Sequence, residues 1–264
     1  FAVPFKHIKG LIEIFSTLKE YRLLKGFSVK RMSWIKIFST NPKYFDFRNG
    51  KWHVDWSNLY SNPGILEDCA PIYTDIKLDE IDILILKELQ KDPMQSISSV
   101  ARIIGVDPKT ARYHYTQHIL KNNIILGYVV NWYGHADACI NHQMASIALE
   151  ISDVDPSQLE TLIYGLEKIP FISFIAFSED NNTLLSYTFM PSTYYMSTLF
   201  YIVHEILSPE MKYNVHTIDV TSSQGFSIPY EKFSKNRWVF NKYTILENIL
   251  EAAEESSKNV GIVV

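Results

Sequence analysis

The stretch SSVARIIGVDPKTARYHYTQHILKNN, Ser98 to Asn123, contains two short helical patterns separated by a turn. Gly105 stands at the turn, where the chain needs a positive φ that glycine adopts without steric cost. Asp107 follows as an N-cap, and Pro108 takes the first position of the next helix, which is a common way for a helix to begin. This order of signals predicts a helix–turn–helix.

Apolar residues at spacings of three and four predict which side of each helix is buried. A further helix, LDEIDILILKELQ, precedes the pair, and Ser96 or Ser98 is expected to cap the second helix. The expected buried residues are Leu78, Ile81, Leu84, Ile85 and Leu89 in the first helix, Val100, Ile103 and Ile104 in the second, and Ala111, Tyr115 and Ile119 in the third.

The opposite face of the third helix is polar and basic, and the second helix of a helix–turn–helix pair can enter the major groove of DNA. Four Lys or Arg face one Asp between Ile97 and Lys121, a local net charge of +3. Exposed basic residues on a helix are usually only a solvated face, but together with the capped turn they favour contact with double-stranded DNA. The candidate DNA-binding residues are Lys109, Thr110, Arg112, Tyr113, Thr116, Gln117 and Lys121.

The chain as a whole is acidic, with a net charge of -4 and a pI near 6.1, although its first 51 residues are basic. Eleven Lys or Arg against three acids give +8 in that segment and leave -12 for the rest. Such a division indicates either a polyanionic partner or internal charge pairing. Under the first alternative, nonspecific phosphate contacts are expected from Lys30, Arg31, Lys36 and Arg48.

From Gln143 onward, strand and helix patterns alternate in the order β-α-β-β-α-β. The segments MASIALEIS, FISFIAF, TLLSYTF and KYNVHTIDV are typical of strands. One helix is expected over 156–168, with Asp155 as its N-cap, and another over STYYMSTLFYIVHEIL. This order is that of ferredoxin-like domains. We therefore predict an α+β fold with a ferredoxin-like domain over 143–242.

The beginning of the chain repeats the end of this domain. At an offset of 186, Tyr44, Phe47 and Trp52 align with Tyr230, Phe233 and Trp238; with a slip of two, Leu11, Ile14 and Phe15 align with Leu199, Ile202 and Val203. The helix pattern over 7–24 has Ile8, Leu11, Ile12, Phe15 and Leu18 on one face. Asn49-Gly50 between aromatic residues predicts a hairpin.

The repeat predicts that residues 1–60, opening with the strand FAVPF, are the second half of another ferredoxin-like unit. Residues 61–77, rich in Pro, Gly and Asp, are expected to be a linker, and residues 243–264 a C-terminal helix and tail. We expect the first half of that unit and another helix–turn–helix to precede Phe1.

The segment from LDEIDILILKELQ through ARIIGVDPKTARYHY to NNIILGY resembles the winged helix–turn–helix of Lrp/AsnC-type (feast/famine) transcription regulators. The resemblance covers Leu78 to Val220 and is most specific through Asp79, Asp82, the Gly105 turn and Pro108. It implies a winged helix–turn–helix over 78–133, followed by a ferredoxin-like ligand-binding and dimer-forming domain. Together with the repeat, it implies a tandem or duplicated form of such a regulator.

The resemblance also implies partners. Double-stranded DNA is the expected partner of the helix–turn–helix, and a small-molecule effector is left open. The ferredoxin-like domains are expected to self-associate or to pair within one chain as a pseudo-dimer. Target sequence, activation or repression, and oligomeric state are not specified by these patterns.

Two further functions are alternatives for this sequence. A helix–turn–helix that no longer binds DNA would serve as a protein-interaction module, and siroheme-decarboxylase-like enzymes resemble the same regulators in architecture. No nucleophile elbow or glycine-rich phosphate loop occurs in the sequence, so we expect a protein that is not an enzyme. A salt titration of DNA binding distinguishes the interaction module from a DNA-binding protein. Visible absorbance after incubation with a tetrapyrrole tests the enzyme hypothesis.

The sequence contains no clear metal-binding motif and no membrane-spanning segment. His135, Asp137, Cys139 and His142 carry ligand atoms, but their spacing fits no compact metal motif, so neither a metal nor a cofactor is expected. Cys69 and Cys139 are the only cysteines, and no apolar run approaches the length of a membrane span. These features favour a cytoplasmic protein that does not enter a membrane.

Overall fold

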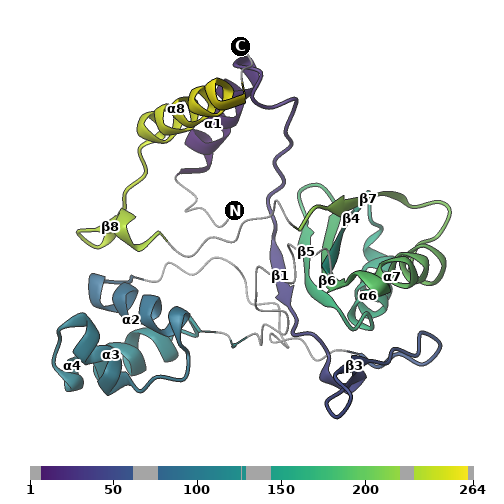
Figure 1. Cartoon of the computed structure of the whole chain (residues 1–264), viewed down its shortest axis with the longest axis horizontal. Helices are drawn as coiled ribbons and strands as arrows, with labels where there is room; N and C mark the ends of the chain where they lie inside the picture. The colour runs from purple at the N-terminus through teal and green to yellow at the C-terminus, as the bar shows by residue number, and fades with distance from the viewer. Residues whose placement is uncertain (1–6, 62–76, 126, 129–143, 221–228, 261–264) are drawn as a thin grey trace. The chain divides into compact units, whose positions relative to one another are not determined.

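The computed structural model describes residues 7–61, 77–125, 127–128, 144–220 and 229–260, and the side chains of all of these except 256–260 (Figure 1). Contacts divide the chain into two units. Unit 1 takes the described parts of Phe1–Val29, Lys77–Ile119 and Ser227–Val264, and unit 2 those of Lys30–Ile76 and Leu120–Phe226. None of the helices in the described ranges has the length and apolar content that crossing a membrane requires.

Unit 2 is built on an antiparallel sheet with the strand order β1-β5-β6-β4-β7. Its elements are β1 (Trp34–Ile37), β4 (Met144–Ser152), α6 (Pro156–Glu167), β5 (Ile172–Ser178), β6 (Thr183–Pro191), η4 (Ser192–Tyr194), α7 (Tyr195–Tyr201), the π-helix η5 (Ile202–Ile206) and β7 (Lys212–Ile218). From β4 to β7 this is the β-α-β-β-α-β order of a ferredoxin-like fold, and the predicted α+β class is confirmed.

The core of unit 2 lies between the sheet and its helices. Alternate residues of β4, among them Ile147, Leu149 and Ile151, are almost fully buried, as the two-residue period of a strand requires. Leu166 of α6 and Ile202 of η5 are fully buried in the same cluster. Figure 1 draws α6 and α7 together beside the sheet. The predicted N-cap of α6 is present, because the Asp155 carboxylate accepts a hydrogen bond from the Ser157 amide at 2.8 Å.

Strand β1 comes from the beginning of the chain and extends this sheet. It pairs antiparallel with β5, with Trp34 opposite Phe177. The Lys36 ammonium contacts the Glu167 carboxylate at 2.6 Å, with both side chains mostly buried, and Lys30 forms an ion pair with Glu150. These pairs place two of the four expected phosphate-binding residues in internal ion pairs, so internal charge pairing holds for Lys30 and Lys36. Their opposite charges stabilise the packing of the basic segment against the acidic one.

Two short hairpins carry the repeated aromatic residues. The first comprises η2 (Pro42–Tyr44), β2 (Phe45–Asp46) and β3 (Lys51–Trp52); the second comprises η6 (Tyr230–Lys232), β8 (Phe233–Ser234) and β9 (Arg237–Trp238). The hairpin predicted from Asn49-Gly50 is confirmed, and Gly50 has a φ of 63°. The two hairpins belong to different units.

The aromatic alignment needs correction at two residues. The helix η2 ends at Tyr44 and η6 ends at Lys232, so Tyr44 corresponds to Lys232 rather than to Tyr230. Phe45 pairs with Trp52, and Phe233 pairs with Trp238, so the counterpart of Phe233 is Phe45 rather than Phe47. Phe47 lies in the turn and is 69% exposed. A constant offset of 186 was wrong because the first hairpin has a loop two residues longer than the second.

Helices α1 (Ile8–Glu20) and α8 (Lys242–Val260) lie side by side in unit 1 (Figure 1). Glu13 and Lys242 form an ion pair, and the His7 and Phe240 rings stack at 4.9 Å. Ile14 and Leu18 are buried, whereas Ile12, expected on the buried face, is 37% exposed. Because α1 packs on α8 and β1 joins the sheet of unit 2, the expected segment 1–60 divides between the two units.

Several expectations fall outside the described residues. These are the strand FAVPF, most of the linker 61–77, residues 126 and 129–133 of the expected wing, and the segment from His135 to His142.

Candidate nucleic-acid interface

The helix–turn–helix lies in unit 1 and is formed by α2 (Glu80–Lys91), α3 (Ile97–Ile104), α4 (Pro108–Tyr113) and the π-helix η3 (His114–Leu120). Ser96, one of two expected caps, accepts a hydrogen bond from the Ser99 amide at 3.1 Å. Gly105 ends α3 with a φ of 74°. Asp107 accepts a hydrogen bond from the Lys109 amide at 2.8 Å and so caps α4. The predicted turn and its caps are confirmed.

The core of the three helices matches the predicted stripes in part. Ile85, Leu89, Val100, Ala111 and Ile119 are buried as expected. Two other expectations were wrong, because Ile103 is 56% exposed and His114, rather than Tyr115, is the buried residue at the start of η3. The second difference follows from the π-helix, whose hydrogen bonds run from residue i to i+5 and turn the buried face away from its α-helical position.

The expected DNA-binding side chains lie on the solvent side. All seven, Lys109, Thr110, Arg112, Tyr113, Thr116, Gln117 and Lys121, are exposed. We define the six on α4 and η3, Lys109 to Gln117 of this set, as the α4 face; Lys121 follows the end of η3. The Thr116 hydroxyl donates a hydrogen bond to the Arg112 carbonyl at 2.9 Å, which leaves the two side chains on the same side of the helix. The α4 face therefore offers two cations and several polar groups to a ligand.

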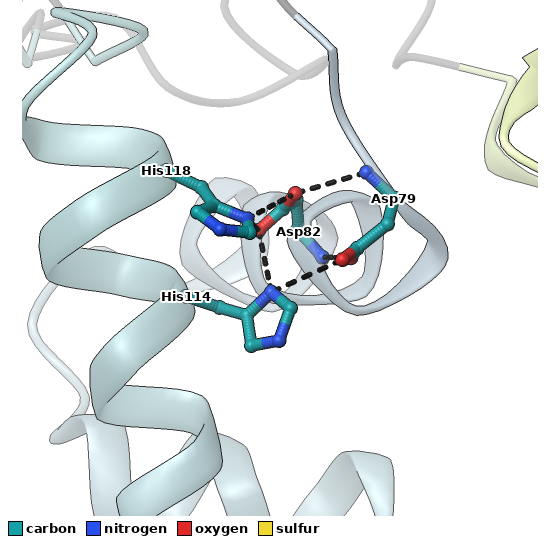
Figure 2. A group of neighbouring side chains, drawn as sticks. All are labelled: Asp79, Asp82, His114 and His118. Atoms are coloured by element: carbon teal, nitrogen blue, oxygen red, sulfur yellow. Dashed lines mark hydrogen bonds and ion pairs between the residues drawn. The ribbon is translucent and has the colours of Figure 1, made fainter.

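Behind the α4 face, the structure brings together four side chains that the sequence analysis did not connect as a site: Asp79, Asp82, His114 and His118 (Figure 2). Asp79 and Asp82 form a capping box at the start of α2, in which each carboxylate accepts a hydrogen bond from the other residue's amide. His114 and His118 project from η3 toward the same point, and Figure 2 shows both rings directed at Asp82.

The distances in this histidine–aspartate cluster are short. Nδ1 of His114 lies 2.9 Å from Asp82 Oδ1 and 3.4 Å from Asp79 Oδ2. Nδ1 of His118 lies 3.1 Å from Asp82 Oδ1 and 3.0 Å from Asp82 Oδ2. The Asp82 side chain is fully buried. The cluster joins α2 to η3 and holds the helix that carries the α4 face.

Sequence signals for this cluster existed but were local. The capping box places two aspartates three residues apart, and His114 and His118 stand four apart, a spacing that puts two side chains on one helix face. The sequence does not predict that the two pairs contact each other, because 32 residues separate His114 from Asp82.

Unit 2 contains a small hollow beside the end of β4. It holds about 120 Å³ and is bordered by Asp153, Val154, Gln158, Ser208 and Lys212. Ligand pockets usually measure roughly 300–1,000 Å³, so this hollow by itself gives no support for an effector site.

No curated protein matches this sequence, whereas several solved structures are similar to it. Similar solved structures include AsnC of E. coli (12% identity, TM-score 0.43, 58% of this chain and 98% of that one) and LrpC of B. subtilis (21%, 0.43, 58% and 99%). Another is a transcriptional regulator of Neisseria meningitidis in complex with L-Met (15%, 0.46, 58% and 96%).

A family model described as the AsnC-type helix-turn-helix domain matches residues 78–113. The match covers α2, α3 and α4, with their capped ends and the Gly105 turn. This part of the chain is therefore a helix–turn–helix of the AsnC type, and the resemblance to Lrp/AsnC-type regulators is confirmed here.

Proposed function

We propose that this protein is a transcriptional regulator of the Lrp/AsnC type that binds double-stranded DNA through the α4 face and Lys121. The observation that carries the proposal is the AsnC-type helix–turn–helix, whose third helix is capped at its start and exposes all of its basic side chains. The Asp107 cap fixes where this helix begins, and the exposed Lys109 and Arg112 supply the positive charge that attracts DNA phosphates. Such a regulator acts in the cytoplasm and needs no catalytic residue.

Within this interface, Lys109 and Arg112 have the leading roles. Both are exposed, and both lie opposite the buried Ala111. Arg can bind the O6 and N7 atoms of guanine with two hydrogen bonds, and Lys can bind a phosphate as a point charge. One of the two is thus expected at a base and the other at the backbone. Thr116 and Gln117, one turn further along, supply polar contacts.

The test begins with selection of a target from random duplexes by the full chain, followed by affinity measurements at several salt concentrations. Lys109→Ala with Arg112→Ala is expected to lower affinity at least about tenfold at moderate salt, because a base contact contributes about 1–3 kcal/mol. In a plot of log affinity against log salt concentration, the double variant should also have a slope smaller in magnitude by about one, because it lacks one phosphate contact.

A matched control removes two cations from the other unit, the half-buried Lys168 and the exposed Lys212, each by substitution with Ala. It has the same change of charge and should leave specific affinity nearly unchanged. An affinity of the Lys109/Arg112 variant within twofold of the unaltered chain contradicts the proposed interface. Failure of the unaltered chain to select any duplex favours the alternative of a protein-interaction module.

Pairing of ferredoxin-like units belongs to the same proposal. Two features support it: β1 from the beginning of the chain adds to the β5 edge, and the two hairpins share a Phe–Trp pair. A two-fold pair would present two helix–turn–helices to a palindromic site. Analytical ultracentrifugation of the full chain tests self-association, and repeating the DNA titration with free amino acids tests modulation by a small-molecule effector.

A further inference from the structure

The histidine–aspartate cluster places a buried carboxylate against two imidazoles. Asp82 is fully buried, and neither it nor Asp79 pairs with a lysine or arginine within the described part of the chain. A buried carboxylate needs a compensating positive charge or a full set of hydrogen-bond donors. Here two imidazole nitrogens converge on one oxygen, Asp82 Oδ1, from 2.9 and 3.1 Å.

The positions of the four ligand atoms fit a single small cation. All of them lie within 4.8 Å of one another. Zinc bonds to imidazole nitrogen and carboxylate oxygen are about 2.0–2.1 Å long, so ligand atoms of a tetrahedral site stand about 3.3 Å apart. The distances from His114 Nδ1 to Asp79 Oδ2 and from His118 Nδ1 to Asp82 Oδ2 are 3.4 and 3.0 Å.

The backbone also supports this arrangement. Asp79 Oδ1 is used by the capping box, in which it accepts the Asp82 amide, whereas Asp79 Oδ2 faces His114. The cap therefore orients one carboxylate oxygen toward the histidines without competing for it. Two histidines four residues apart on one helix face are a known way to bind zinc.

We propose that Asp79, Asp82, His114 and His118 bind a divalent first-row transition metal ion, with Zn²⁺ as the representative species. The ion replaces the two Nδ1 protons and neutralises the two carboxylates. Two imidazoles with two carboxylates suit Zn²⁺ and its neighbours, whereas Mg²⁺ and Ca²⁺ require six or more oxygen ligands. The bound ion ties the start of α2 to η3.

Metal binding at this site does not depend on the proposed function, since it is measured without DNA. It does bear on the same helix, because η3 continues α4. An ion that fixes η3 against α2 stabilises unit 1 by mass action, since it binds the folded form and not the unfolded chain.

The experiment uses the full chain, freed of metal with a chelator and then titrated with Zn²⁺ by calorimetry. Binding of one ion in this cluster is expected, together with a rise of about 5 °C in the thermal midpoint at 100-fold excess over Kd. Co²⁺ in place of Zn²⁺ should give the visible absorption of a four-coordinate site with nitrogen and oxygen ligands.

Two variants test the ligands. Asp79→Asn keeps an oxygen that caps α2 and removes the carboxylate, and His118→Gln removes one imidazole. Each is expected to weaken Zn²⁺ binding about 100-fold or more, since even the loss of an outer partner of a ligand costs about 10–100-fold. Their thermal midpoints in chelator show whether the fold is retained, and Asp79→Asn is the variant designed to retain it.

The control variants remove potential ligands elsewhere, His204→Gln on η5 and Cys139→Ser with His142→Gln. These should leave the affinity of the cluster unchanged. The proposal is overturned if the unaltered chain binds no Zn²⁺, or if Asp79→Asn and His118→Gln bind it as tightly as the unaltered chain. It is equally overturned if only the Cys139/His142 variant loses binding, because the ion would then belong to that segment.

Discussion

The two hairpins of this protein share one pattern and sit in different surroundings. In each, a Phe on the first strand faces a Trp on the second, with ring centroids 4.9 Å apart for Phe45 and Trp52 and 5.0 Å apart for Phe233 and Trp238. A short 3-10 turn precedes each hairpin. The pair of rings is thus a local structure that both copies preserve.

The turns of the two hairpins differ. In the first, the Asp46 carboxylate accepts hydrogen bonds from the Arg48 and Asn49 amides, and Gly50 has a positive φ. In the second, Lys235 and Asn236 both have positive φ, as a two-residue type I′ turn requires. Ser234 occupies the place of Asp46. Different turn residues therefore close the same Phe–Trp pair.

The surroundings differ more than the turns do. Trp52 packs on the fully buried Phe171, and its carbonyl accepts a hydrogen bond from the Tyr194 hydroxyl at 2.6 Å. The second hairpin instead contacts α2, through Tyr230 to Gln90 and through the Lys235 amide to Glu80. One copy rests on a hydrophobic core and the other on the polar side of a helix. A repeated local motif therefore does not determine which surface it packs on.

The largest expected effect is on the free energy of unfolding when the tryptophan of each hairpin is removed. Trp52→Ala is expected to cost about 2–3 kcal/mol, below the range for a fully buried Trp because the side chain is half-buried, and Trp238→Ala about 1 kcal/mol. The excess for Trp52 reflects its contact with the core of unit 2. Urea unfolding followed by peptide-resolved hydrogen exchange reports the two units separately, because a chain with two units need not unfold in one two-state step. Equal costs for the two variants would mean that the Phe–Trp pair alone sets the effect.

Ion pairs give a second contrast between the units. A double-mutant cycle on Lys36 and Glu167 is expected to yield a coupling of about 1 kcal/mol, because both side chains are mostly buried at 17% and 13% exposure. The same cycle on Glu13 and Lys242, which are 36–43% exposed, should yield a coupling too small to resolve at physiological salt. A larger coupling for the exposed pair would contradict the expectation that burial sets the strength of these ion pairs.

The smallest expected effect is a difference in acid response between the hairpins. Hydrogen bonds from the Arg48 amide, and from the side chain and amide of Asn49, hold the pKa of Asp46 below its usual value. A lowered pKa in the folded state means that Asp46 contributes stability above its unfolded pKa, near pH 4, and that this contribution is lost as the pH falls through the folded value.

Hydrogen exchange of the Arg48 and Asn49 amides, measured by NMR, should therefore become faster relative to the intrinsic exchange rates as the pH falls below about 4. The second hairpin, with Ser234 at this position, should show no such change from its turn. Asp46→Asn keeps an acceptor oxygen and removes the titrating group. An unchanged acid response in that variant would exclude Asp46 as its cause.

Much of the fold follows from residues close together in the chain. The Asp107 cap, the Gly105 turn, the hairpin at Asn49-Gly50 and the β-α-β-β-α-β order were all predicted, because each depends on backbone preferences within a few residues. Errors arose where the local rule changed. The π-helix moved the buried position from Tyr115 to His114, and a longer turn shifted the aromatic register.

Local residue patterns were enough to predict the helix–turn–helix, the β-α-β-β-α-β order and the exposed basic side of α4. No local pattern predicted that β1 pairs with β5, that Lys36 contacts Glu167, or that His114 and His118 converge on Asp82. A strand carries the same backbone donors and acceptors whichever edge it joins, and a polar side chain has no periodic signal that names its partner. Contacts between residues distant in the chain are selected by the packing of the whole unit, because only that packing brings the two groups within hydrogen-bonding distance.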